Sequence, residues 1–203
     1  MTASGSKSLA AIGFLTVMEH PQHGLFGGYL VLNSTGRPLE FHCTAPTKPN
    51  RAQEILYGPT LRPYLFGEQI GYALWSKAKL KASCVFTDCE PVLALRDLVE
   101  CPVVLIQQEE ETQGLSLHTE SANGLRDDRE TAAPRGRSSD HEGAVAGRFV
   151  FSLGVFQASL PNRHSSDQQT VAACWRECAE TLDLLEPFDR IRDAIEEAQR
   201  MAA

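Results

Sequence analysis

Cysteine and histidine are the residues of this chain that could bind a transition metal or act as a nucleophile. Cys84 and Cys89 are five positions apart in one extended segment and would face opposite sides of it, whereas structural zinc sites favour ligand pairs from tight turns. Cys174 and Cys178 are one helical turn apart but belong to an apolar stripe. We therefore interpret these thiols as small packing residues of a core.

Three of the six histidines, His20, His23 and His42, are found beside predicted strand ends. His20 and His23 flank a proline in EHPQHG, and we expect them to end a strand in solvent. Cys43 directly follows His42, so a cysteine nucleophile activated by a neighbouring histidine is one candidate. However, adjacent residues of a strand point to opposite faces. These two side chains are therefore predicted not to interact.

The segment from Gly24 to Gly71 is rich in glycine and proline. Glycine permits unusual backbone conformations and proline restricts the backbone, so together they could fix the positions of the residues of a functional site. Two strands, Tyr29–Asn33 and Leu39–Thr44, are predicted around the turn NSTG. The glycine-rich run 24–28 lacks the helix and lysine of a phosphate-binding loop, and we interpret it as a hairpin turn.

A capped helix follows the two strands. Asn50 is placed to cap a helix that begins at Arg51, and Gln53 is placed to reach back to the capping residue. Glu54 therefore lies early on this helix, and Gly58 ends it.

A second helix is predicted over Pro63–Lys79, with a buried stripe of Phe66, Ile70 and Leu74. Its glycines, Gly67 and Gly71, weaken helix propensity by roughly 1 kcal/mol each, so we expect close packing against another element. Apolar runs also predict a first strand at 10–18 and a unit of strand 83–87, helix 91–99 and strand 103–107, which implies parallel pairing.

Residues 108–147 lack apolar periodicity and contain nine acidic and four basic residues. We predict a long, disordered acidic insertion here. A long strand is predicted at 148–159, and a helical segment at 167–201. That segment divides into a helix ending near Leu185 and an amphipathic helix that begins at Pro187, with Phe188, Ile191, Ile195 and Ala198 on one face.

The composition restricts the class of protein. The 203 residues are 42% hydrophobic, which suits one domain spanning 1–203. A net charge of -7 argues against nonspecific nucleic-acid binding. No apolar run reaches the length of a membrane span, and six cysteines without a secretion signal favour the cytoplasm.

Together these elements predict an α/β protein of three layers. We expect a mixed sheet of about six strands, antiparallel over its first three strands and then continuing with helices and parallel strands. The insertion would loop out of this sheet, and two C-terminal helices would pack on it.

The order of three strands, helix, strand, helix and strand resembles the ribonuclease H-like superfold. In that family, acidic residues of the first strand, the first long helix and the fourth strand hold two divalent ions that drive phosphodiester cleavage. The matching elements here contain Glu19, Glu54 and Asp88, and Asp167 could supply a fourth acid. Hard cations such as Mg²⁺ require several oxygen ligands. The resemblance therefore implies catalytic roles for Glu54 and Asp88 and a metal site made of all four acids.

A second resemblance is to the cytidine deaminase fold, carried by GYLVLNSTGRPLEFHCTAPTKPNRAQE, in which Glu54 would match the general acid/base. That family holds zinc with a His or Cys two residues before the glutamate and with a Pro-Cys-x-x-Cys motif. Here Ala52 and the run Pro91–Ala94 stand at those places, so deaminase chemistry is not expected.

The 24–71 segment is also similar to an uncharacterised bacterial protein family, which implies no function. Because no complete catalytic or metal-ligand set is present, we favour a noncatalytic binding or interaction module without a cofactor. The insertion and the last amphipathic helix would be its surfaces for an unknown protein partner. The alternative is a divalent-metal phosphodiesterase using the four acids.

Overall fold

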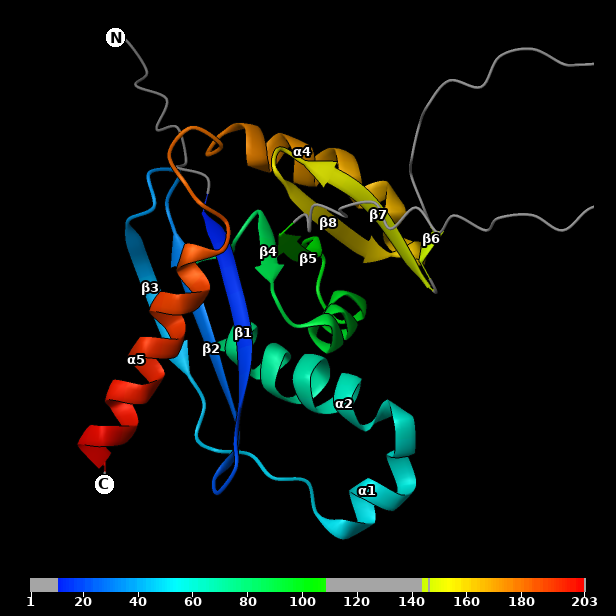
Figure 1. The fold of residues 1–203 in the computed structure, drawn as a ribbon, viewed down its shortest axis with the longest axis vertical. Helices are drawn as coiled ribbons and strands as arrows, with labels where there is room; N and C mark the ends of the chain where they lie inside the picture. The colour runs from blue at the N-terminus through cyan, green and yellow to red at the C-terminus, as the bar shows by residue number, and fades with distance from the viewer. Residues whose placement is uncertain (1–10, 109–143, 146, 203) are drawn as a thin grey trace, which may run out of the picture.

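The computed structural model describes residues 11–108, 144–145 and 147–202, which form a mixed sheet between two helical layers (Figure 1). The α/β class and the three layers predicted from the sequence are confirmed. The strand order is β3-β2-β1-β4-β5-β8-β7-β6. The strands are β1 (Ile12–His20), β2 (Gly24–Leu32), β3 (Pro38–Cys43), β4 (Cys84–Thr87), β5 (Val103–Gln108), β6 (Ala144–Val145), β7 (Arg148–Leu153) and β8 (Phe156–Pro161).

The strand directions agree with the prediction. Strands β1, β2 and β3 are antiparallel neighbours, whereas β4 is parallel to β1 and β5 is parallel to β4. Strands β8, β7 and β6 extend the sheet in antiparallel fashion beyond β5. Most of the predicted insertion, including its acidic residues, lies outside the described residues.

The helical segments cover both faces of the sheet. One layer contains α2 (Leu61–Pro63), the π-helical η2 (Tyr64–Gly71), α3 (Tyr72–Lys77) and the 3-10 helix η3 (Glu90–Asp97). The other contains α4 (Gln168–Arg176) and α5 (Glu186–Ala202). Two short 3-10 helices, η1 (Gly58–Thr60) and η4 (Asn162–Asp167), and the helix α1 (Arg51–Tyr57) complete the set. In Figure 1, α1 projects away from the sheet.

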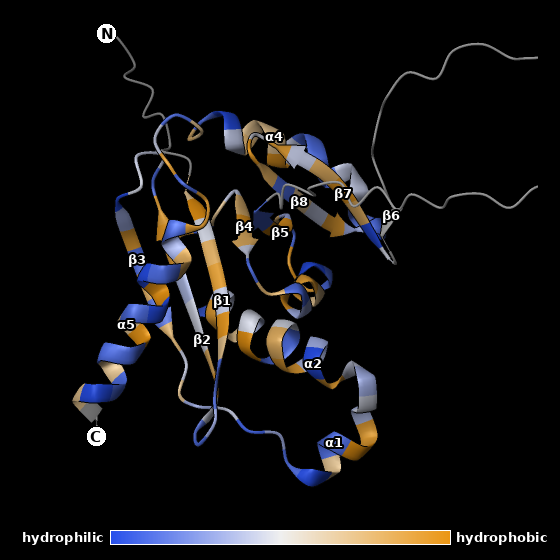
Figure 2. Ribbon diagram, viewed as in Figure 1, coloured by the Kyte–Doolittle hydropathy of each residue, from blue (hydrophilic) through white to orange (hydrophobic). Residues whose placement is uncertain are grey.

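Alternating side chains of the central strands build a separate apolar core on each face. On β1, Ile12 and Phe14 contact the layer of α4 and α5, whereas Leu15 and Val17 contact the layer of η2 and η3. Among the strands at the centre of the sheet, β1 and β4 are mainly apolar in Figure 2, and β1 ends in polar residues. A strand with two buried faces needs apolar residues at nearly every position, which is the pattern of this chain.

The helix predicted over 63–79 is present as the continuous run α2-η2-α3. Its predicted stripe is buried, with Phe66, Ile70 and Leu74 each at most 4% exposed. A Cβ atom at Gly67 would lie 2.8 Å from the backbone nitrogen of Leu95 in η3, so this glycine permits the close packing that we expected.

The interpretation of 24–28 as a hairpin turn is wrong, because the turn is formed by residues 21–23 and β2 begins at Gly24. Gly24 has a φ of 96° and follows the turn, but Gly27 and Gly28 lie inside β2. A Cβ atom at Gly27 would lie 2.1 Å from Ile70, and one at Gly28 would lie 2.2 Å from Ile191 of α5. These two glycines let a helix contact each face of the same strand.

Three further elements differ from the predictions in type or extent. The strand expected at 148–159 is the hairpin β7–β8, because Gly154 adopts a φ of 68° and reverses the chain. The helix expected over 91–99 is the 3-10 helix η3. The helix expected to reach Leu185 ends at Arg176, after which turns continue and Thr181 donates a hydrogen bond to the Ser34 carbonyl.

Both C-terminal helices are present, although α4 is shorter than predicted. Beyond the end of α4, Cys178 of the predicted apolar stripe is still buried, and so is Leu182. Within the ranges that the structure describes, no helix has the length and apolar character to cross a membrane.

Candidate ligand-binding site

The four acidic residues predicted as metal ligands each pair with a different arginine. Glu19 accepts a hydrogen bond from Arg62 at 2.6 Å, and Glu54 accepts one from Arg51 at 3.0 Å. The other two ion pairs are Asp88 with Arg192 and Asp167 with Arg96. Among the residues that the structure describes, no group of three or more His, Cys, Asp or Glu side chains could hold a metal ion. The structure therefore does not bring the four acids together as one ligand set.

Asp88 is the predicted catalytic residue nearest the core. Its side chain is 15% exposed, and its partner Arg192 comes from α5, where the same guanidinium also binds Asp189 at 2.7 Å. The Cys89 thiol donates to the Asp88 carboxylate over 3.3 Å. Burial raises the pKa of Cys89 to about 11, and the Asp88 charge acts in the same direction. Cys89 is therefore a neutral thiol at pH 7 and a poor nucleophile.

Glu54, the other predicted catalytic residue, lies on a helix that is separated from the sheet. None of the described side chains of α1 is buried. The capping box predicted from the sequence is present, since Asn50 and Gln53 exchange hydrogen bonds of 2.9 and 3.0 Å. Catalytic and metal-binding roles for Glu54 and the other acids stay predictions.

The histidines and cysteines discussed in the sequence analysis lie mostly as predicted. All six cysteines are free thiols, and Cys84, Cys174 and Cys178 are buried. His20 is the last residue of β1 and is half-buried, whereas His23 is exposed in the β1–β2 turn, with the two rings 4.6 Å apart.

His42 and Cys43 project from opposite sides of the sheet, as expected for adjacent strand residues. His42 binds Glu40 at 2.7 Å, whereas the exposed Cys43 lines a hollow beside α5. The two side chains therefore contact different groups.

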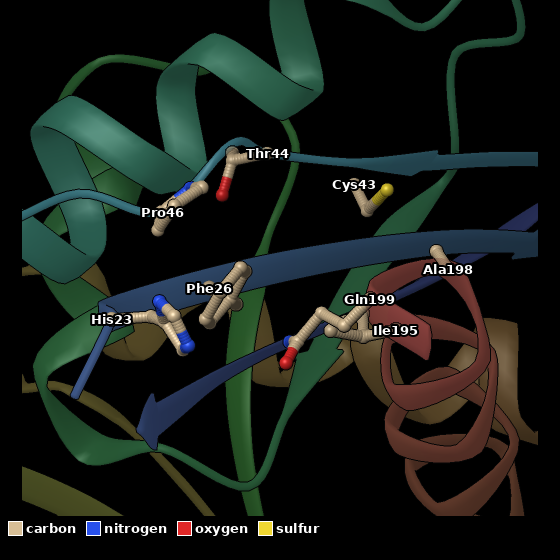
Figure 3. A pocket seen from close by; sticks show the side chains of 8 residues that line it. All are labelled: His23, Phe26, Cys43, Thr44, Pro46, Ile195, Ala198 and Gln199. Atoms are coloured by element: carbon tan, nitrogen blue, oxygen red, sulfur yellow. The ribbon is translucent and has the colours of Figure 1, made fainter. Parts of the chain in front are cut away.

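That hollow is the candidate site of this protein. It has a volume of about 340 Å³ and lies between the end of the β2–β3 pair and the last turns of α5 (Figure 3). It is lined mainly by apolar atoms, from His23, Phe26, Cys43, Thr44, Pro46, Ile195, Ala198 and Gln199.

The packing of α5 explains why the hollow forms. Ile191 and Ile195 contact β2 directly above Gly28, where the missing side chain brings the helix close to the strand. The helix continues beyond this contact, so Ala198 and Gln199 line the hollow instead of packing against the sheet (Figure 3). We expected Ala198 on the buried face of this helix, but it is exposed and lines the hollow.

The polar groups of the hollow are few and include hydrogen-bond donors. The Thr44 hydroxyl oxygen accepts from the Gly27 N–H at 2.9 Å, which leaves its own hydrogen to donate. The Cys43 thiol, the Gln199 amide and the His23 ring lie around the same space (Figure 3). An apolar cavity with a few convergent polar groups is the usual form of a small-molecule site.

No protein-family model matches the chain, and no curated protein matches it.

The sequence pointed to only part of the hollow. The amphipathic pattern of 187–201 places Ile195 and Ala198 on one face of the last helix. That pattern could have indicated the wall of the hollow that α5 forms. Phe26, Thr44 and Pro46 form the opposite wall, about 150 positions away in the chain. No local pattern indicates that these two segments meet.

Proposed function

We propose that this chain is a noncatalytic binding module whose α5 hollow takes a small ligand. The ligand that suits the lining has an apolar body and one end that accepts hydrogen bonds, such as a carboxylate or carbonyl group. The observation that supports this proposal is an apolar cavity with hydrogen-bond donors at its wall.

The apolar body of the ligand follows from the side chains that it would contact. Phe26, Pro46 and Ile195 present carbon surface from two segments, so a hydrocarbon or aromatic group would be removed from water on both sides. Each Å² of apolar surface so buried contributes about 25 cal/mol. The volume of about 340 Å³ suits a small ligand, since ligand pockets measure roughly 300 to 1,000 Å³.

The accepting end of the ligand follows from the hydrogen-bond donors. Thr44 has a hydroxyl hydrogen left to donate, and Gln199 has an amide NH₂. Neither Asp nor Glu is among the residues lining the hollow, so a carboxylate would meet no fixed negative charge in its wall.

The test is a titration with octanoate, which combines an apolar chain with a carboxylate, followed by backbone NMR. We expect saturable shifts at residues 23–26, 43–46 and 195–199. Octylammonium, which has the same chain length but donates instead of accepting, should bind at least threefold more weakly. Ala198→Trp fills the hollow with an indole ring and should abolish the octanoate shifts.

Met201→Trp is the matched control, because Met201 is 78% exposed on the same helix and does not line the hollow. This variant should bind octanoate as the unmodified chain does. The proposal is wrong if octanoate gives no saturable shifts, or if Ala198→Trp binds it equally well.

The alternative function is a divalent-metal phosphodiesterase of ribonuclease H-like fold. Its support is the observed order of three antiparallel strands followed by two parallel ones, on which the resemblance depends. Asp88 would first have to release Arg192 to bind a metal ion. Mg²⁺-dependent hydrolysis of bis(p-nitrophenyl) phosphate that disappears in Asp88→Asn would favour this alternative, and its absence would count against it.

A further inference from the structure

Two buried cysteines that are far apart in sequence face each other across the core. The Sγ atoms of Cys84 on β4 and Cys174 on α4 are 3.0 Å apart, with the Cys84 thiol donating to the Cys174 sulfur. A disulfide bond measures about 2.05 Å, so the two sulfur atoms would have to approach by roughly 1 Å. Cys84 and Cys174 belong to the same apolar cluster, which holds β4 and α4 together.

The two members of this pair differ in their access to a cavity. Cys174 lines a hollow of about 720 Å³ between the α3–β4 connection and α4, together with Lys79, Lys81, Ser83, Thr170 and Glu177. Cys84 is fully buried and does not line that hollow. A small oxidant that enters would therefore meet Cys174 first.

We infer that Cys84 and Cys174 form an oxidation site, in which Cys174 reacts with a peroxide and Cys84 then closes an intramolecular disulfide. This inference does not depend on the ligand hollow beside α5, because the two cavities share no lining residue. From the sequence pattern alone, these two thiols were interpreted only as packing residues of the core.

The reaction balances with hydrogen peroxide as the oxidant. The Cys174 thiolate attacks one peroxide oxygen, the O–O bond breaks, and the released hydroxide takes up the proton lost by Cys174 to become water. Cys174 is then a sulfenic acid. The Cys84 sulfur attacks the Cys174 sulfur, the S–O bond breaks, and the departing hydroxide takes the Cys84 proton as a second water. Two thiols are oxidised and one peroxide is reduced.

The electrostatics of the pair agree with this assignment of roles. The hydrogen bond from Cys84 lowers the pKa of Cys174, whereas the same bond and burial raise the pKa of Cys84. The thiolate is the form that reacts with peroxide, so Cys174 is the better nucleophile of the two.

Cys178 is the nearby thiol that does not suit this role. Its Sγ donates to the backbone carbonyls of Cys174 and Trp175, at 3.6 and 3.4 Å. Burial raises the pKa of Cys178 to about 12. It therefore serves as an internal control for thiol oxidation in the same region.

The test is peptide mapping by mass spectrometry, without reduction, of the full chain after treatment with hydrogen peroxide. Cys43→Ser is used as the background, because Cys43 is exposed and could link two molecules. We expect a Cys84–Cys174 crosslink and the loss of two alkylatable thiols. Adding Cys178→Ser should leave the crosslink unchanged.

Removing each partner separates the two steps. With Cys84→Ser, Cys174 should stay a sulfenic acid and react with dimedone, whereas Cys174→Ser should give neither crosslink nor dimedone adduct at Cys84. The inference is overturned if Cys84 and Cys174 both stay reduced after peroxide treatment of the folded Cys43→Ser chain, or if either links to Cys178 instead.

Discussion

Glu40 shows how a single side chain joins two distant segments. Its carboxylate accepts the backbone N–H groups of Lys79 at 3.0 Å and Leu80 at 2.9 Å, and it also binds the His42 ring. These contacts tie β3 to the chain that follows α3. They lower the pKa of Glu40 from 4.5 to about 2, with the Lys79 N–H as the largest cause.

Because this pKa is lower in the folded chain than in the unfolded chain, the ionised carboxylate stabilises the fold above about pH 4.5. That contribution is lost as the pH falls towards 2. Glu40→Gln should therefore lower the free energy of unfolding by about 1 kcal/mol at pH 7 and by less at pH 3. Urea unfolding at both pH values measures the difference.

Glu180→Gln is the control, since the same substitution at an exposed position should change stability little at either pH. A stability loss for Glu40→Gln that is equally large at pH 3 and pH 7 would contradict this account of the carboxylate.

At the scale of elements, α1 forms for local reasons. Its capping box joins Asn50 and Gln53, while Ile55 and Leu56 are 67% and 81% exposed and contribute little to either core. Isolated helices this short are marginal in water, so the cap is a large part of what stabilises α1.

Asn50→Ala should therefore destabilise α1 by about 1 kcal/mol without unfolding the sheet. We expect faster amide hydrogen exchange over 51–57 and a thermal midpoint of the whole chain within about 2 °C of the original value. Gln53→Glu retains the capping-box chemistry and should preserve the exchange protection. A large fall in the midpoint for Asn50→Ala would mean that α1 supports the core after all.

At the scale of the whole molecule, two arginine–aspartate ion pairs join η3 to the chain that leads into α4, and Asp97 of η3 also binds the His164 ring at 3.0 Å. Arg96 and Asp167 pair at 2.6 Å with side chains 15% and 14% exposed, and Arg96 also donates to the Val99 carbonyl. Arg163 and Asp97 join the same segments, but with side chains 61% and 44% exposed. The Arg163–Asp97 pair is therefore much more accessible to water than the Arg96–Asp167 pair.

Asp167→Asn should lower the free energy of unfolding by about 1.5 to 3 kcal/mol, because Arg96 loses a charged partner in a poorly hydrated place. The matched variant Asp97→Asn should cost no more than about 1 kcal/mol, since water and salt screen its exposed pair. Denaturant unfolding of both variants at the same ionic strength measures the contrast. Equal losses would show that burial does not govern these pairs.

Local sequence patterns specify many elements of this fold. The capping box at Asn50, the stripe of Phe66, Ile70 and Leu74, and the parallel strands β4 and β5 were all predicted. Each depends on residues within a few positions of one another or on one short connection. The predictions were wrong where one local pattern is compatible with two structures. The run 148–159 was predicted as one strand, but the positive φ of Gly154 makes it a hairpin.

Contacts between distant parts of the chain were decided only by tertiary structure. The walls of the α5 hollow, the arginine partner of Asp167 at 71 positions and the thiol partner of Cys84 at 90 positions all depend on the order of strands and the paths of the loops. The physical reason is that burial and hydrogen bonding constrain each element locally, whereas several arrangements of the same elements satisfy those constraints. Close packing then decides between these arrangements. For example, the absence of a side chain at Gly28 allows Ile191 of α5 to contact β2.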